Sequence, residues 1–359
     1  MRILFNLVVF TIFLANTSFA QEEKETFTIE KEIKHLPVIN QGNTGTCWSF
    51  ATVSFLECEI IRKGHKETDL SEMYFVNYAY LNKAKKYLFY YGKNNFSQGG
   101  QAHDVIDVLL KEGMVTYEAF PGEKVDGKYR HGDLVKALKK EVTALNEKKE
   151  DFDASDLETL KPILKEHLGK ISDKVKTEDG RFTPVEFVEN FEINPDDYVE
   201  LSSYTHHPYY DAFVLEVPDN WSHGLYYNVP IDELMEIMYY SINNGYTVCW
   251  DGDTSEKMFL HKKGKADLPE NQIGKVEQEL RQETFYNRTT TDDHLMHIVG
   301  LSKDSAGRTC FYTKNSWGAE SNDYGGYLHM TEDYVRLKTL AILVHKDAIP
   351  ENIRVKLNL

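Results

Sequence analysis

The sequence predicts an α+β protein in two parts, a helix-rich first half and a second half dominated by antiparallel sheet. In the first part, apolar residues recur at the three- and four-residue spacing of helices. After residue 200, short runs rich in β-forming residues alternate with turns. At 359 residues, the chain is also longer than one simple core usually holds, so we expect two lobes.

Three helices are predicted in the first part, residues 21–120. The first spans residues 47–63, where apolar side chains fall on one face and Gly64 ends the pattern. The second follows Ser71 and runs through MYFVNYAYLNKAKKYL. The third reads AHDVIDVLLKEG and comes directly after the pair Gly99–Gly100 and Gln101.

A charged segment, residues 121–200, is predicted to be a helical insertion. Its leucines recur at helical spacing, which is typical of amphipathic helices with solvated outer faces. Phe182 is followed by a helix start in which Thr183 is the cap, Pro184 lies in the first turn and Glu186 comes three residues after the cap.

The last part, residues 201–359, is predicted to form the sheet. Its strand-like runs are DAFVLEV, YTVCW, HLMHIVGL, RTCFYTKN, GGYLHM and LAILVHK. One helix, IDELMEIMYYSINNG, is expected to interrupt them.

The first twenty residues have the pattern of a secretory signal peptide. Arg2 supplies the positive start, residues 3–14 are apolar, and Ser18 and Ala20 form a small-x-small cleavage site. The apolar run is shorter than the roughly 20 residues that cross a bilayer. We therefore expect cleavage after Ala20, export to the periplasm or the medium, and no membrane insertion of the mature protein.

Composition narrows the classes of function. The 57 acidic residues outnumber the 41 basic ones, which argues against nucleic acid as a partner. The four cysteines are scattered and no pair has CxxC spacing, so a zinc site or a dense disulfide framework is not expected. We interpret His206 and His207 as loop residues, and no HExxH, GxGxxG or P-loop motif indicates a metal or cofactor. Three of the cysteines are expected to be small buried hydrophobes: Cys58, Cys249 and Cys310.

Cys47 differs from the other cysteines because it lies where a helix begins, in NQGNTGTCWSFAT. Backbone N–H groups at a helix N-terminus favour a thiolate, which is the nucleophilic form. A thiol nucleophile needs a histidine from elsewhere in the chain, and DDHLMHIVGL offers His294 and His297. Because side chains alternate along a strand, only one of the two can face Cys47.

Further groups that such a nucleophile needs are also present. Asn315, at the end of a strand, can orient the imidazole, and Trp317 can shield that hydrogen bond from water. Gln41 and the N–H of Cys47 can both donate to an oxyanion.

The blocks QGNTGTCWSFAT, DHLMHIVG and KNSWG…GGY, in this order, resemble the signature blocks of papain-like cysteine peptidases. LSEMYFVNYAYLNKAKKYLFYY, GGQAHDVIDVLLKEGMV, FTPVEFVEN and NNGYTVCWDGD resemble the bleomycin hydrolase and aminopeptidase C branch in particular. The resemblance implies a two-lobed papain-like fold, with a helical left lobe and a β-sheet right lobe. It implies a cysteine peptidase, most simply an aminopeptidase acting on peptide substrates, and it leaves assembly as a homo-oligomer open.

Residue by residue, the resemblance implies that Cys47 is the nucleophile, His294 the catalytic histidine, Asn315 its orienter and Gln41 an oxyanion donor. It implies that Gly99 and Gly100 meet extended substrate. In this branch a C-terminal arm in the cleft restricts the enzyme to N-termini, and the tail AIPENIRVKLNL leaves that point open. Two alternatives therefore stay open: an endopeptidase with an unobstructed cleft, and a non-catalytic peptide-binding protein on the same scaffold.

Overall fold

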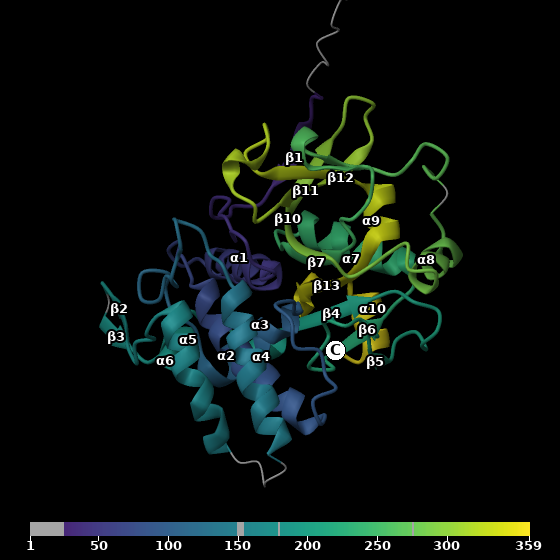
Figure 1. Cartoon of the computed structure of the whole chain (residues 1–359). Helices are drawn as coiled ribbons and strands as arrows, with labels where there is room; N and C mark the ends of the chain where they lie inside the picture. Colours follow the sequence, from purple (N-terminus) through teal and green to yellow (C-terminus); the bar gives the residue numbers. More distant parts are fainter. Residues whose placement is uncertain (1–24, 149–153, 179, 275) are drawn as a thin grey trace, which may run out of the picture.

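Two parts are visible in the computed structural model, which describes residues 25–148, 154–178, 180–274 and 276–359. Helices α1 to α6 gather on one side and a large sheet lies on the other (Figure 1). The predicted signal peptide, residues 1–20, lies outside the described residues and stays a prediction. Among the residues that are described, no helix is both long and apolar enough to cross a membrane.

The predicted α+β class is confirmed, and the helices of the first part lie where the sequence places them. Ser71 caps α2 by accepting the Tyr74 N–H at 3.1 Å, and Thr183 and Glu186 form the predicted capping box of α6. The helix bounds are α1 (Cys47–Arg62), α2 (Glu72–Phe89), α3 (Ala102–Glu112), α4 (Gly132–Glu147), α5 (Lys161–Leu168) and α6 (Pro184–Glu189).

An eleven-stranded, mostly antiparallel sheet makes up the second part, with parallel pairing only between β4 and β6 and between β9 and β12. Its order is β5-β6-β4-β13-β7-β10-β11-β12-β9-β8, with β1 paired to β10. The strands are β1 (Thr28–Glu32), β4 (Tyr198–Ser202), β5 (Ala212–Val214), β6 (Leu225–Asn228), β7 (Val248–Gly252), β8 (Phe259–Leu260), β9 (Lys265–Ala266), β10 (His294–Lys303), β11 (Thr309–Lys314), β12 (Tyr327–Thr331) and β13 (Thr339–His345).

Two expectations about secondary structure need correction. The segment predicted to be a helical insertion also contains a hairpin, β2 (Val175–Thr177) and β3 (Gly180–Phe182). Within residues 201–274 and 276–359, the second part holds four α-helices rather than one: α7 (Ile231–Asn243), which was predicted, α8 (Gln278–Tyr286), α9 (Glu332–Lys338) and α10 (Glu351–Leu357). The last two have seven residues each, too few to show a period, and α8 buries Arg281, Gln282 and Thr284 instead of an apolar stripe.

Short 3-10 helices complete the chain. They are η1 (Ala154–Leu160), η2 (Pro195–Asp197), η3 (His261–Lys263), η4 (Ala319–Ser321) and η5 (Lys346–Ala348).

Both faces of the central strands are covered, because alternate side chains enter two different cores. On β7, Cys249 faces the core that contains α1, whereas Trp250 faces the core that contains α7. On β10, Leu295 faces the core that contains α1 and Met296 faces the core that contains α7. Helix α1 is therefore clamped between the sheet and the other helices, and all its residues from Cys47 to Ile60 are buried.

Candidate active site

Cys47 is the first residue of α1 and only 8% exposed. The loop before it is held from two sides. Gly42 has φ +69° and approaches Tyr129 so closely that a Cβ atom would lie 2.7 Å from its carbonyl oxygen. The Gly45 N–H donates to Gln98 Oε1 at 2.8 Å. These contacts explain why glycine-rich sequence precedes the thiol: it lets the loop pack tightly and present Cys47 at the helix start.

Burial is the largest influence on the pKa of the Cys47 thiol. Burial raises its pKa to about 12, and a hydrogen bond from the backbone of Leu295 opposes that rise only in part. The carboxylates of Asp251, Asp292 and Asp219 raise the thiol pKa further. Leu295 directly follows His294, so strand β10 brings the predicted histidine next to the residue that contacts the thiol.

His294 begins β10, and its ring is hydrogen-bonded to Asn315 just beyond the end of β11. The His294 Nε2 and Asn315 Oδ1 atoms are 2.7 Å apart. Asn315 Oδ1 also accepts the Ser316 N–H at 2.7 Å, which identifies that atom as the amide oxygen. His294 Nε2 must therefore carry the hydrogen in the neutral ring, and Nδ1 keeps a lone pair that can accept a proton. Burial lowers the pKa of His294 to about 4, against the opposing effect of Asn315.

Two aromatic rings shield this hydrogen bond. Trp317 lies with its ring centroid 4.9 Å from that of His294 and 4.6 Å from that of His261. His261 Nδ1 lies 3.4 Å from the Asn315 amide nitrogen and accepts from it, while burial lowers the His261 pKa to about 4. Sequence reasoning missed His261, since no motif in FLHKK relates it to Asn315.

Gln41 is buried and its side chain is fixed at both ends. Its Oε1 accepts the Ser316 hydroxyl at 2.5 Å, and its Nε2 donates to the Thr44 carbonyl at 2.7 Å. An amide nitrogen has two hydrogens, so one remains for a further acceptor. The N–H of Cys47, at the first position of α1, has no partner within its own helix. The site thus has the two donors that the sequence predicts for an oxyanion.

His297 lies on the other side of β10 from His294, as strand alternation predicts. Its Nδ1 is 2.9 Å from the Ser54 hydroxyl on α1, and its ring packs edge-on against Phe55. His297 is a packed strand residue, and its partner Ser54 lies two turns along α1 from Cys47.

Gly100 lies against the indole of Trp48, the neighbour of Cys47. A Cβ atom on Gly100 would approach the Trp48 ring to 3.0 Å. A Cβ atom on Gly99 would lie 1.8 Å from Asp219 Oδ2, so the Asp219 carboxylate covers this glycine. Asp219 comes from the segment 215–224 between β5 and β6, and sequence reasoning did not single it out.

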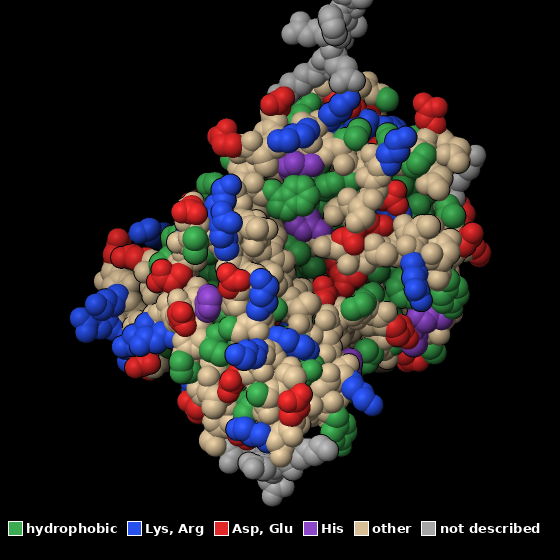
Figure 2. Space-filling model, in the orientation of Figure 1, with side chains coloured by type: hydrophobic (Ala, Val, Ile, Leu, Met, Phe, Trp, Pro, Cys, Tyr) green, Lys and Arg blue, Asp and Glu red, His purple; other side chains and the backbone are tan. Residues whose placement is uncertain are grey.

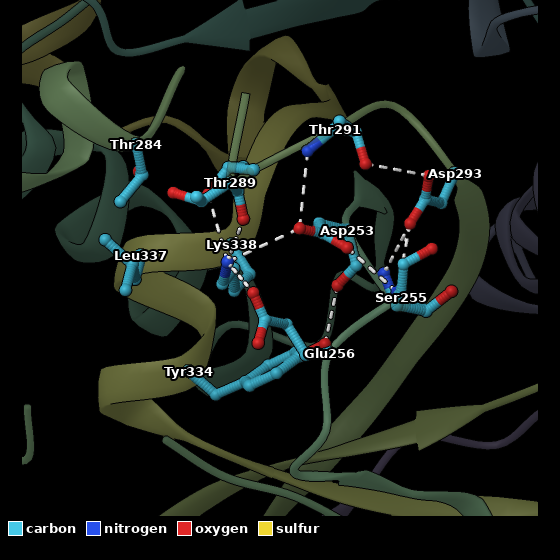
Figure 3. Close-up of polar contacts among 12 residues, drawn as sticks. Asp253, Ser255, Glu256, Thr284, Thr289, Thr291, Asp293, Tyr334, Leu337 and Lys338 are labelled. Carbon is cyan, nitrogen blue, oxygen red and sulfur yellow. Dashed lines mark hydrogen bonds and ion pairs between the residues drawn. The ribbon is translucent and has the colours of Figure 1, made fainter. Parts of the chain in front are cut away.

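The loop that leads into His294 is anchored by a cluster that we call the Lys338 cluster: Lys338, Asp253, Glu256 and Asp293 (Figure 3). The Lys338 ammonium donates to the Thr289 carbonyl at 2.6 Å, to Asp253 Oδ2 at 3.3 Å and to Glu256. Asp293 Oδ2 accepts the Ser255 N–H at 3.0 Å. These contacts hold both ends of residues 289–293 and so set where β10 begins.

Seen from outside, histidine, hydrophobic and acidic side chains gather between the helical part and the sheet (Figure 2).

His206, His207 and Glu216 also lie close together, with one potential metal-ligand atom of each within 4.8 Å of the others. Hydrogen bonds account for the trio. Gln282 Oε1 accepts the Thr205 N–H at 2.6 Å, so its amide nitrogen is the atom 3.0 Å from His206 Nδ1. His206 Nε2 then carries the hydrogen, which it donates to Glu216 at 3.1 Å. That tautomer offers no lone pair toward the space between the three residues.

Comparison with protein families gives two adjoining matches. Residues 169–358 match the Peptidase C1-like family, and residues 25–175 match the Papain family cysteine protease model.

Individual relatives agree with these matches. Aminopeptidase W from Lactobacillus delbrueckii subsp. lactis is 24% identical, and the alignment covers 94% of this chain and 87% of the relative. Bleomycin hydrolase from Gallus gallus is 26% identical, with 88% and 82% covered. The crystal structure of PepW from Lactobacillus rhamnosis has a TM-score of 0.72 at 18% identity, covering 92% of this chain and 84% of PepW. The last likeness supports the fold alone. The chain belongs to the peptidase C1-like family and is a papain-family cysteine peptidase.

Proposed function

We propose that this peptidase is an aminopeptidase that uses Cys47 and His294. The observation that carries the catalytic assignment is the hydrogen bond of 2.7 Å between His294 and Asn315, which leaves His294 Nδ1 as the proton acceptor beside the residue that contacts Cys47. The exopeptidase mode is supported by the relatives named aminopeptidase W and aminopeptidase G.

The reaction proceeds by nucleophilic catalysis. His294 Nδ1 takes the proton of the Cys47 thiol as the sulfur attacks the carbonyl carbon of the first peptide bond. The imidazolium stays aligned because its Nε2–H donates to Asn315. Gln41 Nε2 and the Cys47 N–H donate to the developing oxyanion. His294 then protonates the leaving amine, and water, deprotonated by the same ring, hydrolyses the thioester.

The C-terminal tail packs against a different part of the molecule from the one that the resemblance implies. Leu357 is buried in the core that contains α7, and Leu359 packs against that core. Lys356 donates to Glu233 on α7 at 2.6 Å. Residues 356–359 therefore pack on the α7 face of the sheet, opposite to α1.

A pair of fluorogenic dipeptide amides, one with a free α-amine and one N-acetylated, tests the proposal. We expect release from the free-amine substrate alone, and a fall of at least about a thousandfold for Cys47→Ala, because the nucleophile is lost. Cys310→Ala is the control, since Cys310 is buried in the sheet. Comparable release from both substrates would identify an endopeptidase. Full activity of Cys47→Ala would overturn the assignment of the nucleophile.

We also propose that the enzyme acts after export, on the basis of residues 1–20. Deletion of residues 2–20 is expected to retain the protein in the cytoplasmic fraction of an expressing bacterium, and unchanged export would contradict this.

A further inference from the structure

The segment 215–224 closes one end of the cleft at Gly99. The Asn95 side chain donates to the Pro218 carbonyl and to Asp219 Oδ1, both at 2.9 Å. The Ser97 hydroxyl donates to the same Oδ1 at 3.2 Å. These bonds turn the other oxygen, Oδ2, onto Gly99, where it fills the space of a side chain. An extended peptide lying along Gly99–Gly100 meets a carboxylate at this point.

The anchoring of this segment is itself polar and buried. Ser222 Oγ donates to Asp104 Oδ1 at 3.0 Å and lies 2.8 Å from His103 Nε2. Burial lowers the pKa of His103, but the Glu200 carboxylate more than offsets this, and the pKa rises to about 9. The charged imidazole thus ties the segment to α3 and β4 at neutral pH. These contacts hold the segment that carries Asp219 in a fixed position.

Two further carboxyl groups lie near the thiol. Asp251 is 3% exposed, and neither of its carboxyl oxygens has a hydrogen-bond donor among the nitrogen and hydroxyl groups of the described residues. Its neighbour Asp292 accepts the Gln101 side-chain N–H at 2.9 Å, and the two carboxyl groups share a proton. We call Asp219, Asp251 and Asp292 the cleft carboxylates.

This arrangement opposes ionisation of the Cys47 thiol. Each cleft carboxylate raises the pKa of Cys47, although the reaction needs a thiolate. Lys83, whose pKa burial lowers and the Asp219 charge in part raises, makes its hydrogen bonds elsewhere: its ammonium donates to the carbonyls of Ser97, at 2.9 Å, and Gly99. Asp219, Asp251 and Asp292 thus crowd a site that must develop further negative charge, and the one proton that Asp251 and Asp292 share leaves negative charge uncompensated there. This indicates that a cation arrives with the ligand.

We infer that the cleft carboxylates bind the α-ammonium group of the substrate, with Asp219 marking where the peptide must end. This inference rests on the proposed function and names the device that makes the enzyme an aminopeptidase. Side-chain carboxylates from the segment between β5 and β6 and from the ends of β7 and β10 take the part that the C-terminal arm has in the branch the sequence resembles. The bound ammonium also offsets the negative charge beside Cys47, so the substrate promotes ionisation of the thiol that attacks it.

Binding can be measured without catalysis in the full chain carrying Cys47→Ala. The probes are leucinamide, which has a free α-amine, and N-acetyl-leucinamide, which does not, titrated by calorimetry at pH 7. We expect leucinamide to bind at least tenfold more tightly. Adding Asp219→Asn should reduce that preference by about 10- to 100-fold, as expected for the loss of a charged hydrogen bond. The amide oxygen can still accept from Asn95 and Ser97, so the segment should keep its place.

Asp211→Asn is the matched control, because it removes one negative charge from an exposed position before β5 and should leave the preference unchanged. If Asp219→Asn does not fold, Asp292→Asn provides the second test and should also weaken the binding of leucinamide. Equal binding of the two probes, or a preference that survives Asp219→Asn, would overturn the inference. Such a result alongside hydrolysis that depends on Cys47 would leave the peptidase assignment standing. A preference lost in Asp219→Asn, in a protein without hydrolytic activity, would support the inference and count against the proposed function.

Discussion

Two acidic clusters flank His294, and they differ in how their charge is balanced. Asp292 belongs to the cleft carboxylates, whereas the next residue, Asp293, belongs to the Lys338 cluster. The same division separates Asp251 from Asp253 at the end of β7. The Lys338 ammonium lies among the carboxylates of its own cluster and is 3% exposed as a side chain. The cleft carboxylates have no such lysine within hydrogen-bonding distance among the described contacts.

This difference distinguishes a structural cluster from a binding site. Buried charges are stable when an opposite charge and hydrogen bonds compensate for lost hydration. In the Lys338 cluster the protein supplies both (Figure 3), and these contacts anchor the loop that leads into His294. In the cleft the compensation is incomplete: two carboxyl groups share a proton, and the third caps Gly99. The four predictions below test this contrast.

The largest effect is expected from Lys338→Met. This change leaves Asp253 and Glu256 without their cation in a buried place, and removal of one partner from such a cluster typically costs about 3–5 kcal/mol. Urea unfolding monitored by circular dichroism should show a loss of that size. Lys136→Met, at an exposed site on α4, should change the free energy of unfolding by less than about 0.5 kcal/mol. A loss below about 1 kcal/mol for Lys338→Met would remove the distinction between the two clusters.

The second effect is a pH dependence of amine binding. Burial raises the pKa of Asp292 to about 7, the charge of Asp219 adds to the rise, and the Gln101 hydrogen bond opposes it. Protonation of Asp292 below pH 7 removes negative charge from the site, while the α-amine of leucinamide stays protonated there. Leucinamide affinity of the Cys47→Ala protein should therefore fall by up to about tenfold per pH unit below pH 7. Affinity that stays constant between pH 5 and 7 would contradict this.

The effect of Asp292 on the free energy of unfolding changes with pH in the opposite direction to that of most paired carboxylates. The folded-state pKa of Asp292 lies above its ordinary value of 3.8, so the folded protein keeps this proton while the unfolded chain loses it. Asp292 therefore reduces the free energy of unfolding progressively as pH rises from about 4 to 7. Asp292→Asn should flatten that part of the stability profile.

The smallest effect is expected from Asp251→Asn. Burial and the charge of Asp292 hold the pKa of Asp251 well above its usual range, so this group is already neutral when Asp292 is charged. An amide in its place can donate to Asp292 as the carboxyl group does, and the free energy of unfolding should change by less than about 1 kcal/mol. Asp253→Asn, which weakens the partnership with Lys338, should cost more, and the reverse order would contradict the comparison.

Much of the site was predictable because its residues come in recognisable local patterns. Cys47 follows a glycine-rich loop and starts a helix, and Gln41 precedes it by six residues. His294 and Asn315 lie at strand ends in blocks that resemble those of known peptidases. The structure brings the His294 and Asn315 side chains into contact and places Gln41 beside Ser316, the residue after Asn315. The catalytic roles themselves remain predictions.

Other parts of the site have no local pattern. His261 and Asp219 lie in stretches that resemble no motif, and the block NNGYTVCWDGD gives no role to Asp251. The surroundings of each residue are set by partners far along the chain. Asp219, for example, covers Gly99, which is separated from it by most of the helical part. Similarly, the two short helices α9 and α10 owe their existence to packing rather than to a repeat that a sequence window could detect.

The sequence by itself determined the helices of the first part, the predominance of sheet in the second, the position of Cys47 at a helix start and the resemblance to the family. These features depend on contacts between residues close in the chain, through capping, periodicity and turn chemistry. Only the tertiary structure decided which nitrogen of His294 is free, that the C-terminal tail packs against α7, and that Asp219 closes the cleft. These features depend on which distant segments are buried together, and burial is a property of the whole chain rather than of any short stretch.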